Sequence, residues 1–234
     1  MFHLYTNVLS PDKTYADFEA LDALREELLD SPDSLLFTDY GAGGEKQAQR
    51  KRKVSDIAAL AAKPPQLARL LYRLAEEAQA GTIVELGTSL GLSTLHLALP
   101  KPDAAVITFE GCPETAKAAK ANFAKFKRNN IQVITGNIDE TLAPALKQIQ
   151  QIDLAFLDAN HREEPTIRYF NLLAEKRTEQ SMFILDDIHW SPGMERAWEK
   201  IKADPRVSLS ADLFWMGIVF FRSGVVKQDF VFKI

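Results

Sequence analysis

Short apolar segments alternate with amphipathic segments from residue 82 onward. Apolar runs without strict alternation are typical of strands that are covered on both faces of a sheet. The runs are 82–87, 105–111, 131–136, 153–158 and 181–187. The segments between them have helical periodicity, at 92–99, 114–126, 138–149, 163–176 and 192–203. This strand–helix alternation predicts a parallel sheet joined by right-handed crossovers.

The alternation of predicted strands and helices ends after segment 192–203. Segments 207–213 and 215–222 are both extended, and almost no room remains between them for a crossover helix. They predict an antiparallel hairpin on the sheet edge. The predicted fold is therefore α/β, with a doubly wound, mostly parallel sheet of seven strands that ends in this hairpin.

The first part of the chain carries no strand signal of comparable strength. Segment 14–30 has an amphipathic helical period, and segment 64–80 begins with two prolines and stops at Gly81, as a helix does. Residues 39–53 are rich in glycine and then basic, which predicts a mobile loop. Its charge cluster, Arg50–Lys53, is typical of a solvated surface more than of a phosphate site.

The charge balance, the cysteine count and the length of the apolar runs exclude several classes of site and protein. The 28 lysines and arginines nearly balance 32 acidic residues, so nothing points to a nucleic-acid partner. The one cysteine, Cys112, excludes an intrachain disulfide and a thiolate zinc site. No apolar run approaches the roughly 18 residues that would suggest a membrane helix, and the amino terminus does not resemble a signal peptide. We therefore expect a cytoplasmic protein.

The turn after the first predicted strand, ELGTSLG at 85–91, is the clearest binding motif. A dinucleotide fingerprint would need glycine where the chain has Ser89 and Leu92, and a P-loop would need Gly-Lys at 92–93. With these two motifs excluded, the turn consists of an acidic residue followed by two glycines, whose lack of side chains lets a ligand approach the backbone closely. Glu110 ends the second strand, nineteen residues after Gly91, where a carboxylate can accept both hydroxyls of a ribose. The pair favours an adenosine-type ligand.

Residues 85–94 (ELGTSLGLST) followed by 107–111 (ITFEG), together with the terminal hairpin, resemble the class I S-adenosylmethionine-dependent methyltransferases. The resemblance is to the catechol and caffeoyl-CoA O-methyltransferase-like group and covers about residues 54–222. It implies a Rossmann-like domain at 82–234 that binds S-adenosylmethionine, covered by a helical segment at 1–81 within one structural domain. The cofactor residues that it implies are Glu85, Gly87, Ser89, Gly91, Glu110, Asn137 and Asp158. The family often has aspartate where this chain has Asn137.

Carboxylates follow two further predicted strands. Asp158 ends one strand, and Asp186 and Asp187 end the next. If these strands are neighbours, the three carboxylates converge and repel one another, and a divalent cation such as Mg²⁺ would relieve the repulsion. The alternative is that they cap helices or stay solvated. That alternative is weaker after the second strand, where Ser191 and Pro192 already supply a helix start.

The resemblance implies a role for the same residues. Asp158, Asp186 and Asp187 align with metal-ligand segments of the caffeoyl-CoA-like enzymes, which usually have asparagine as the third ligand. The catalytic lysine of the family falls on His161, which can still accept a proton from a hydroxyl. The implied reaction is transfer of a methyl group to a small hydroxylated acceptor, with Asp158 and His161 as catalytic residues and Mg²⁺ on the three aspartates. Relatives of this kind are often homodimers.

Several alternatives stay open. The enzyme could be a metal-independent methyltransferase in which His161 acts alone, or the chain could be a binding module that transfers nothing. An iron site of His161, His189 and Asp186 is a further hypothesis. Ser89 and Leu92 disfavour a nicotinamide dehydrogenase, and the isoelectric point of about 5.7 disfavours a nucleic-acid methyltransferase. Trp190 lies in a strand–helix loop, where it could form a wall against a flat substrate.

Overall fold

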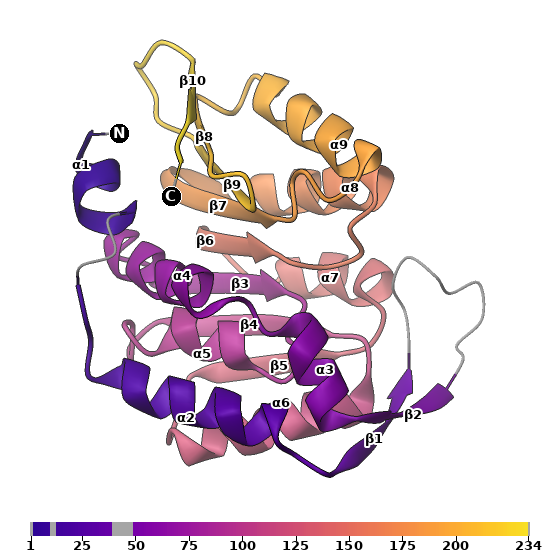
Figure 1. The fold of residues 1–234 in the computed structure, drawn as a ribbon. Coiled ribbons are helices and arrows are strands. Elements are labelled where there is room, and N and C mark those ends of the chain that lie inside the picture. The colour runs from indigo at the N-terminus through magenta and orange to yellow at the C-terminus, as the bar shows by residue number, and fades with distance from the viewer. Residues whose placement is uncertain (1, 10–12, 39–48, 234) are drawn as a thin grey trace.

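The computed structural model describes residues 2–9, 13–38 and 49–233, and its centre is an eight-stranded sheet with helices on both faces (Figure 1). The strand order is β10-β8-β9-β7-β6-β3-β4-β5. The strands are β3 (Thr82–Leu86), β4 (Ala105–Glu110), β5 (Ile131–Thr135), β6 (Ile152–Leu157), β7 (Arg177–Asp186), β8 (Leu209–Asp212), β9 (Met216–Phe220) and β10 (Gln228–Val231). The five predicted parallel strands and the β8–β9 antiparallel hairpin are confirmed.

The helices are the crossovers and the amino-terminal cover. They are α1 (Phe2–Leu4) with the π-helical turn η1 (Tyr5–Leu9), α2 (Asp17–Leu29), α3 (Val54–Ala61), α4 (Pro65–Glu77), α5 (Leu92–Ala98), α6 (Pro113–Lys125), α7 (Ile138–Leu146), α8 (Glu163–Ala174) and α9 (Pro192–Ala203). Helix α9 begins as predicted, because the Ser191 hydroxyl accepts a hydrogen bond from the Met194 N–H and Pro192 occupies the first turn. Helix α3 was not predicted.

The strand order reverses beside β3, which pairs with β4 on one side and β6 on the other. The chain builds β3, β4 and β5 outward in one direction and then returns to place β6 and β7 on the opposite side. In open parallel sheets, the crevice beyond the strand ends at this reversal is the usual ligand site. The topology therefore brings the loops after β3, β4, β6 and β7 to one edge.

Apolar packing ties the amino-terminal helices to the sheet. Phe18 and Leu21 of α2 and Ile57 of α3 share a buried cluster with Leu95 of α5 and Phe123 of α6. Two further clusters fill the two faces of the sheet, one beneath α4 and α5 and the other beneath α7, α8 and α9. Helix α3 thus lies near the edge that carries the loops after β3 and β4, and α2 packs beside it against α5 and α6 (Figure 1).

The prediction of a loop through residue 53 was wrong for its last part. Gln49–Lys53 forms strand β2, which pairs antiparallel with β1 (Ser34–Thr38), whereas residues 39–48 lie outside the described part of the chain. The Arg52 guanidinium lies 4.9 Å from the centre of the Phe37 ring, and the Thr38 N–H donates to Cys112 Sγ at 3.3 Å. Cation–π and long-range contacts of this kind stabilise a strand whose local composition is polar.

The edge of the sheet also differs from the prediction. Strand β10 pairs parallel to β8 and adds an eighth strand outside the hairpin. Its four residues are mostly exposed, so no apolar run signals the strand in the sequence. Strand β9 lies between β7 and β8, and all five of its residues are buried.

Candidate active site

The loop between β3 and α5 passes close to the end of β6. A Cβ atom on Gly87, whose φ is +103°, would lie 2.1 Å from the backbone oxygen of Asp158. A Cβ on Gly91, whose φ is +86°, would lie 2.4 Å from Cε1 of Phe123. Both positions combine a left-handed backbone with a close approach, so only glycine fits without movement of the neighbours. The loop is therefore held tightly against the crevice at the strand ends.

Glu110 lies at the end of β4 beside this loop. Its two carboxylate oxygens accept hydrogen bonds from the backbone N–H groups of Ser89 and Cys112, each at 2.8 Å. Burial raises the pKa of the Glu110 carboxyl, and the two N–H donors oppose that shift because they favour the charged form. Each oxygen keeps a second lone pair, so the fixed carboxylate can also accept hydrogen bonds from two neighbouring hydroxyls.

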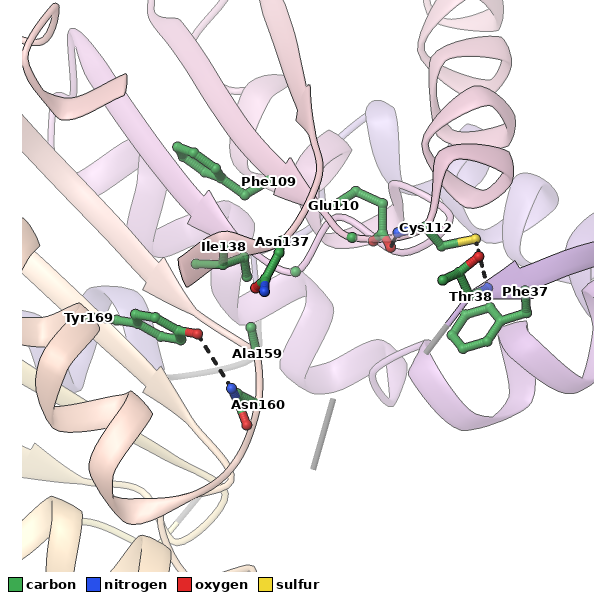
Figure 2. Close-up of a pocket in the computed structure, with 12 residues that line it drawn as sticks. Phe37, Thr38, Phe109, Glu110, Cys112, Asn137, Ile138, Ala159, Asn160 and Tyr169 are labelled. Carbon is green, nitrogen blue, oxygen red and sulfur yellow. Dashed lines mark hydrogen bonds between the residues drawn. The ribbon is translucent and has the colours of Figure 1, made fainter. Parts of the chain in front are cut away.

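A cavity of about 200 Å³ opens next to Glu110 (Figure 2). Gly87, Glu110 and Asn137 are the predicted cofactor residues that line it. The Asn137 side chain caps α7 by accepting a hydrogen bond from the Asp139 N–H at 3.1 Å. Other lining residues come from β1, from the loop after β6 and from α8, and they include Phe37, Thr38, Ala159, Asn160 and Tyr169. The unpredicted strand β1 therefore forms part of the rim.

Glu85 does not line this cavity. Its side chain is fully buried and accepts hydrogen bonds from the hydroxyls of Ser93, Thr94 and Thr108 at 2.5–2.6 Å. These contacts join the end of β3 to α5 and to β4 beneath the glycine loop. Burial raises the pKa of the Glu85 carboxyl to about 7, although the three hydroxyls favour its charged form. Contact between Glu85 and the methionine part of a cofactor remains a prediction.

The raised pKa of Glu85 predicts a stability that falls with rising pH. The unfolded chain ionises this carboxyl near its ordinary value of 4.5, whereas the folded chain resists ionisation until about 7. The contribution is therefore present below pH 4.5 and is lost as pH rises through 7. Between pH 5 and pH 8, we expect wild type to lose about 2 kcal/mol of unfolding free energy relative to Glu85→Gln. Urea titrations at both pH values measure this difference, and an unchanged difference would contradict the prediction.

The loops after β6 and β7 bring two buried carboxylates together with a lysine. Lys63 Nζ lies 3.0 Å from Asp158 Oδ2 and is hydrogen-bonded to Asp186 Oδ2. Burial alone would raise the pKa of Asp158, but the Lys63 ammonium and His161 outweigh it and lower that pKa. Burial and the neighbouring Asp158 raise the pKa of Asp186 well above its usual range. The predicted convergence of Asp158 and Asp186 is therefore what the structure shows.

Asp187 lies on the outer side of this group. Its carboxylate is 3.7 Å from Nδ1 of His161, whose Nε2 is 3.4 Å from Asp158 Oδ1. Within the described residues, the side chains close enough together to share a metal ion are Asp158, His161 and Asp186, and Asp187 is not among them. His189 is also outside that group, because its Nε2 lies 2.9 Å from Asp212 Oδ2. The contact of His189 with Asp212 does not favour the iron site, which stays a hypothesis.

The sequence analysis missed Lys63, which lies in the short segment between α3 and α4. Its signal was weak: a lysine before two prolines, in a region with no strand or binding motif. Only the packing of α3 against the loop after β3 brings Lys63 to the carboxylates. Lys63 contacts both carboxylates and offsets part of the repulsion between Asp158 and Asp186, although burial and Asp158 still raise the pKa of Asp186.

Exposed aromatic side chains border the acidic group. Trp190, Phe214 and Trp215 are 72%, 59% and 53% exposed. Two of them are joined to Asp187 through the backbone, because the Asp187 N–H donates to the Trp215 carbonyl and the Trp190 N–H donates to the Asp187 carbonyl. Phe214 and Trp215 meet edge to face, with ring centres 5.1 Å apart. Trp190, which the sequence predicts as a wall against a flat substrate, is therefore connected through Asp187 to two further exposed aromatic residues, Trp215 and Phe214.

The chain matches known methyltransferases over this region. Residues 84–188, which run from β3 to just past β7, match a protein family described as "Methyltransferase domain". A catechol O-methyltransferase of Niastella koreensis is 27% identical over 175 residues, which cover 73% of each chain. The chain is thus similar to O-methyltransferases over its central region.

Other curated relatives of this chain are transmembrane O-methyltransferases. Those of Homo sapiens and Propithecus coquereli are 34% identical over 116 residues, or 47% of this chain. The match spans 38% and 41% of their lengths, about two fifths. Among the residues that the structure describes, none of the helices has the length and apolar character needed to cross a bilayer.

Solved methyltransferases share the fold. The O-methyltransferase TomG of Streptomyces achromogenes, in complex with SAM, superposes with a TM-score of 0.63, at 18% identity and 95% coverage of both chains. The O-methyltransferase of Bacillus cereus, in complex with SAH, gives 0.59 at 20% identity, with 94% of this chain and 95% of that chain covered. At these identities the likeness concerns the fold, so the function of the site follows only from the residues of this chain.

Proposed function

We propose that this protein is a methyltransferase that transfers the methyl group of S-adenosylmethionine to a hydroxyl oxygen of a small acceptor. The observation that carries the proposal is the fixed carboxylate of Glu110, held by two backbone N–H groups beside a glycine loop at the reversal of strand order. A ribose offers two adjacent hydroxyls to such a carboxylate. Gly87 and Gly91 keep side chains out of the space along the loop.

The chain's own residues fit S-adenosylmethionine. Glu110 would hold the ribose, Asn137 would border the adenine, and the loop at 87–91 would lie along the methionine part. When bound, the cofactor supplies a methyl group on a positively charged sulfur. Because methyl transfer is an in-line displacement, the protein mainly aligns the acceptor oxygen with the methyl carbon and the sulfur. Residues 1–81 would cover the acceptor.

His161 is the residue that we place at the acceptor hydroxyl. Its ring lies between the carboxylates of Asp158 and Asp187, which fix its orientation and can stabilise a positive charge on it. Methyl transfer would exchange the carbon–sulfur bond of S-adenosylmethionine for a carbon–oxygen bond to the acceptor, leaving S-adenosylhomocysteine, and His161 would accept the proton of the acceptor hydroxyl. The exposed rings of Trp190, Phe214 and Trp215 suit a flat, hydroxylated acceptor.

We infer that Asp158, Asp186 and Asp187 do not together hold Mg²⁺, contrary to the expectation from the sequence. Mg²⁺ needs oxygen ligands at about 2.0–2.1 Å in octahedral geometry. The Lys63 ammonium lies between Asp158 and Asp186, and Asp187 faces His161 instead. The proposed reaction therefore uses no metal step.

The experiment that tests the proposal has two stages. Calorimetric titration with S-adenosylmethionine and S-adenosylhomocysteine should show one site per chain, and absence of heat from folded protein would end the cofactor proposal. Incubation with S-adenosylmethionine and a panel of hydroxylated aromatics, starting with catechol and phenol, should then release S-adenosylhomocysteine. Binding without release from any member of a broad panel would favour the alternative of a binding module.

A further inference from the structure

Lys63 lies where a cation would bind between the two buried carboxylates. Its Nζ is 3.0 Å from Asp158 Oδ2 and within hydrogen-bond contact of Asp186 Oδ2. The side chains of Lys63 and Asp158 are 15% and 14% exposed, and that of Asp186 is 2% exposed. An ammonium carries three N–H donors, and two of them serve these carboxylates. The third serves neither carboxylate, and Nζ also lies 5.9 Å from the centre of the Phe156 ring.

The backbone holds Lys63 in this position. Helix α3 ends just before it, where the Ala62 N–H donates to the Ala58 carbonyl at 2.8 Å. Pro64 and Pro65 follow at once, and Pro65 is the first residue of α4. Proline fixes its own φ and restricts the residue before it, so this segment has little freedom to swing away. The aliphatic stem is buried, which further limits other rotamers.

A metal ion and this ammonium exclude each other. Asp158, His161 and Asp186 each offer an atom within 4.8 Å of the others, so the three could hold a divalent ion if the space between them were open. The Lys63 ammonium takes that space and adds a positive charge that repels a divalent ion. Expelling it would leave a buried ammonium without its carboxylate partners, which is unfavourable.

We propose that Lys63 is the resident cation of this site and takes the place of a divalent metal ion between Asp158 and Asp186. It keeps the two carboxylates together and presents one N–H to the acceptor oxygen beside His161. Lys63 is thus a positioning residue for the carboxylates and a binding residue for the acceptor. The part of this inference that concerns the acceptor rests on the proposed function, whereas the exclusion of metal does not.

Mn²⁺ binding tests the exclusion without any cofactor or acceptor. Free Mn²⁺ has an electron paramagnetic resonance signal that broadens on binding, so a titration counts sites directly. Wild type should show no saturable site, and Lys63→Met should gain one site with affinity raised about 100-fold, because the excluding charge is gone. Adding Asp186→Asn to Lys63→Met should remove the gain. Lys51→Met, at an exposed lysine, is the matched control and should behave as wild type.

The results that would overturn the role of Lys63 differ from those that would contradict the proposed function. A saturable Mn²⁺ site in wild type that Asp186→Asn abolishes would overturn the proposal, and that result holds even if Lys63→Met does not fold. A folded Lys63→Met or Lys63→Gln protein without the new site would also overturn it, because Lys63 would then not be what excludes the ion. Failure of S-adenosylmethionine to bind would contradict the proposed function and leave the Mn²⁺ result untouched.

Discussion

Replacement of Glu110 with glutamine is expected to weaken S-adenosylmethionine binding about 100-fold, the equivalent of losing one or two charge-assisted hydrogen bonds. The carboxylate oxygens are acceptors only, so each can receive a backbone N–H and a ribose hydroxyl together. Glutamine has one such oxygen, and its NH₂ group would face the backbone N–H of either Ser89 or Cys112, so that two donors would meet. The loop backbone should also lose part of its support, because the Ser89 N–H bond weakens.

Calorimetry with wild type, Glu110→Gln and Glu114→Gln measures this effect. Glu114 follows Glu110 by four residues and is exposed in the first turn of α6. Its replacement with glutamine makes the same change of charge at a residue that does not line the cavity. We expect Glu114→Gln to bind as wild type does. Urea unfolding of both variants controls for stability. Equal affinities for all three proteins would show that the carboxylate at the end of β4 does not contact the ligand.

The fold was predictable where one pattern dictated one structure. The strands β3, β4 and β6 and the buried second half of β7 are mostly apolar. Helix α9 also has start signals that the structure uses, Ser191 and Pro192. Strands β2 and β10 were not predictable in this way. The residues of β2 are basic, and its stability comes from pairing with β1 and from the contact of Arg52 with Phe37, both of which are tertiary.

The candidate site also contains residues that the sequence could place and residues that it could not. The glycine loop and Glu110 could be placed together because both end neighbouring parallel strands, and the structure joins them through the Ser89 N–H. Asp158 and Asp186 converge for the same reason, since β6 and β7 are adjacent. Lys63 could not be placed, because it reaches the site through the packing of α3 and not through the sheet. Asp187 turns away in a left-handed conformation, with φ of +53°, that its sequence does not reveal.

Replacement of His161 with alanine is expected to lower kcat by about 10²–10⁴-fold with little change in the affinity for S-adenosylmethionine. The ring is the proton acceptor that we place at the acceptor hydroxyl, and its side-chain contacts are with Asp158 and Asp187, not with Glu110, which would hold the ribose of the cofactor. Asp158 and Asp187 would remain in place, but a carboxylate already paired with Lys63, as Asp158 is, makes a poor substitute base. The loss should therefore appear in the chemical step.

Steady-state release of S-adenosylhomocysteine, measured with the best acceptor of the panel, separates this loss from a structural defect. Added imidazole should restore part of the rate to His161→Ala, because a free base can enter the space that the ring leaves. His3→Asn is the control: His3 is exposed and contacts Glu77 near the amino-terminal ends of the strands, so its loss should not change kcat. A His161→Ala enzyme with full activity would assign proton removal to solvent or to Asp187. In that case the ring would serve to hold Asp158 and Asp187 apart, and only the alignment of the acceptor by Lys63 and the aromatic wall would remain of the proposed chemistry.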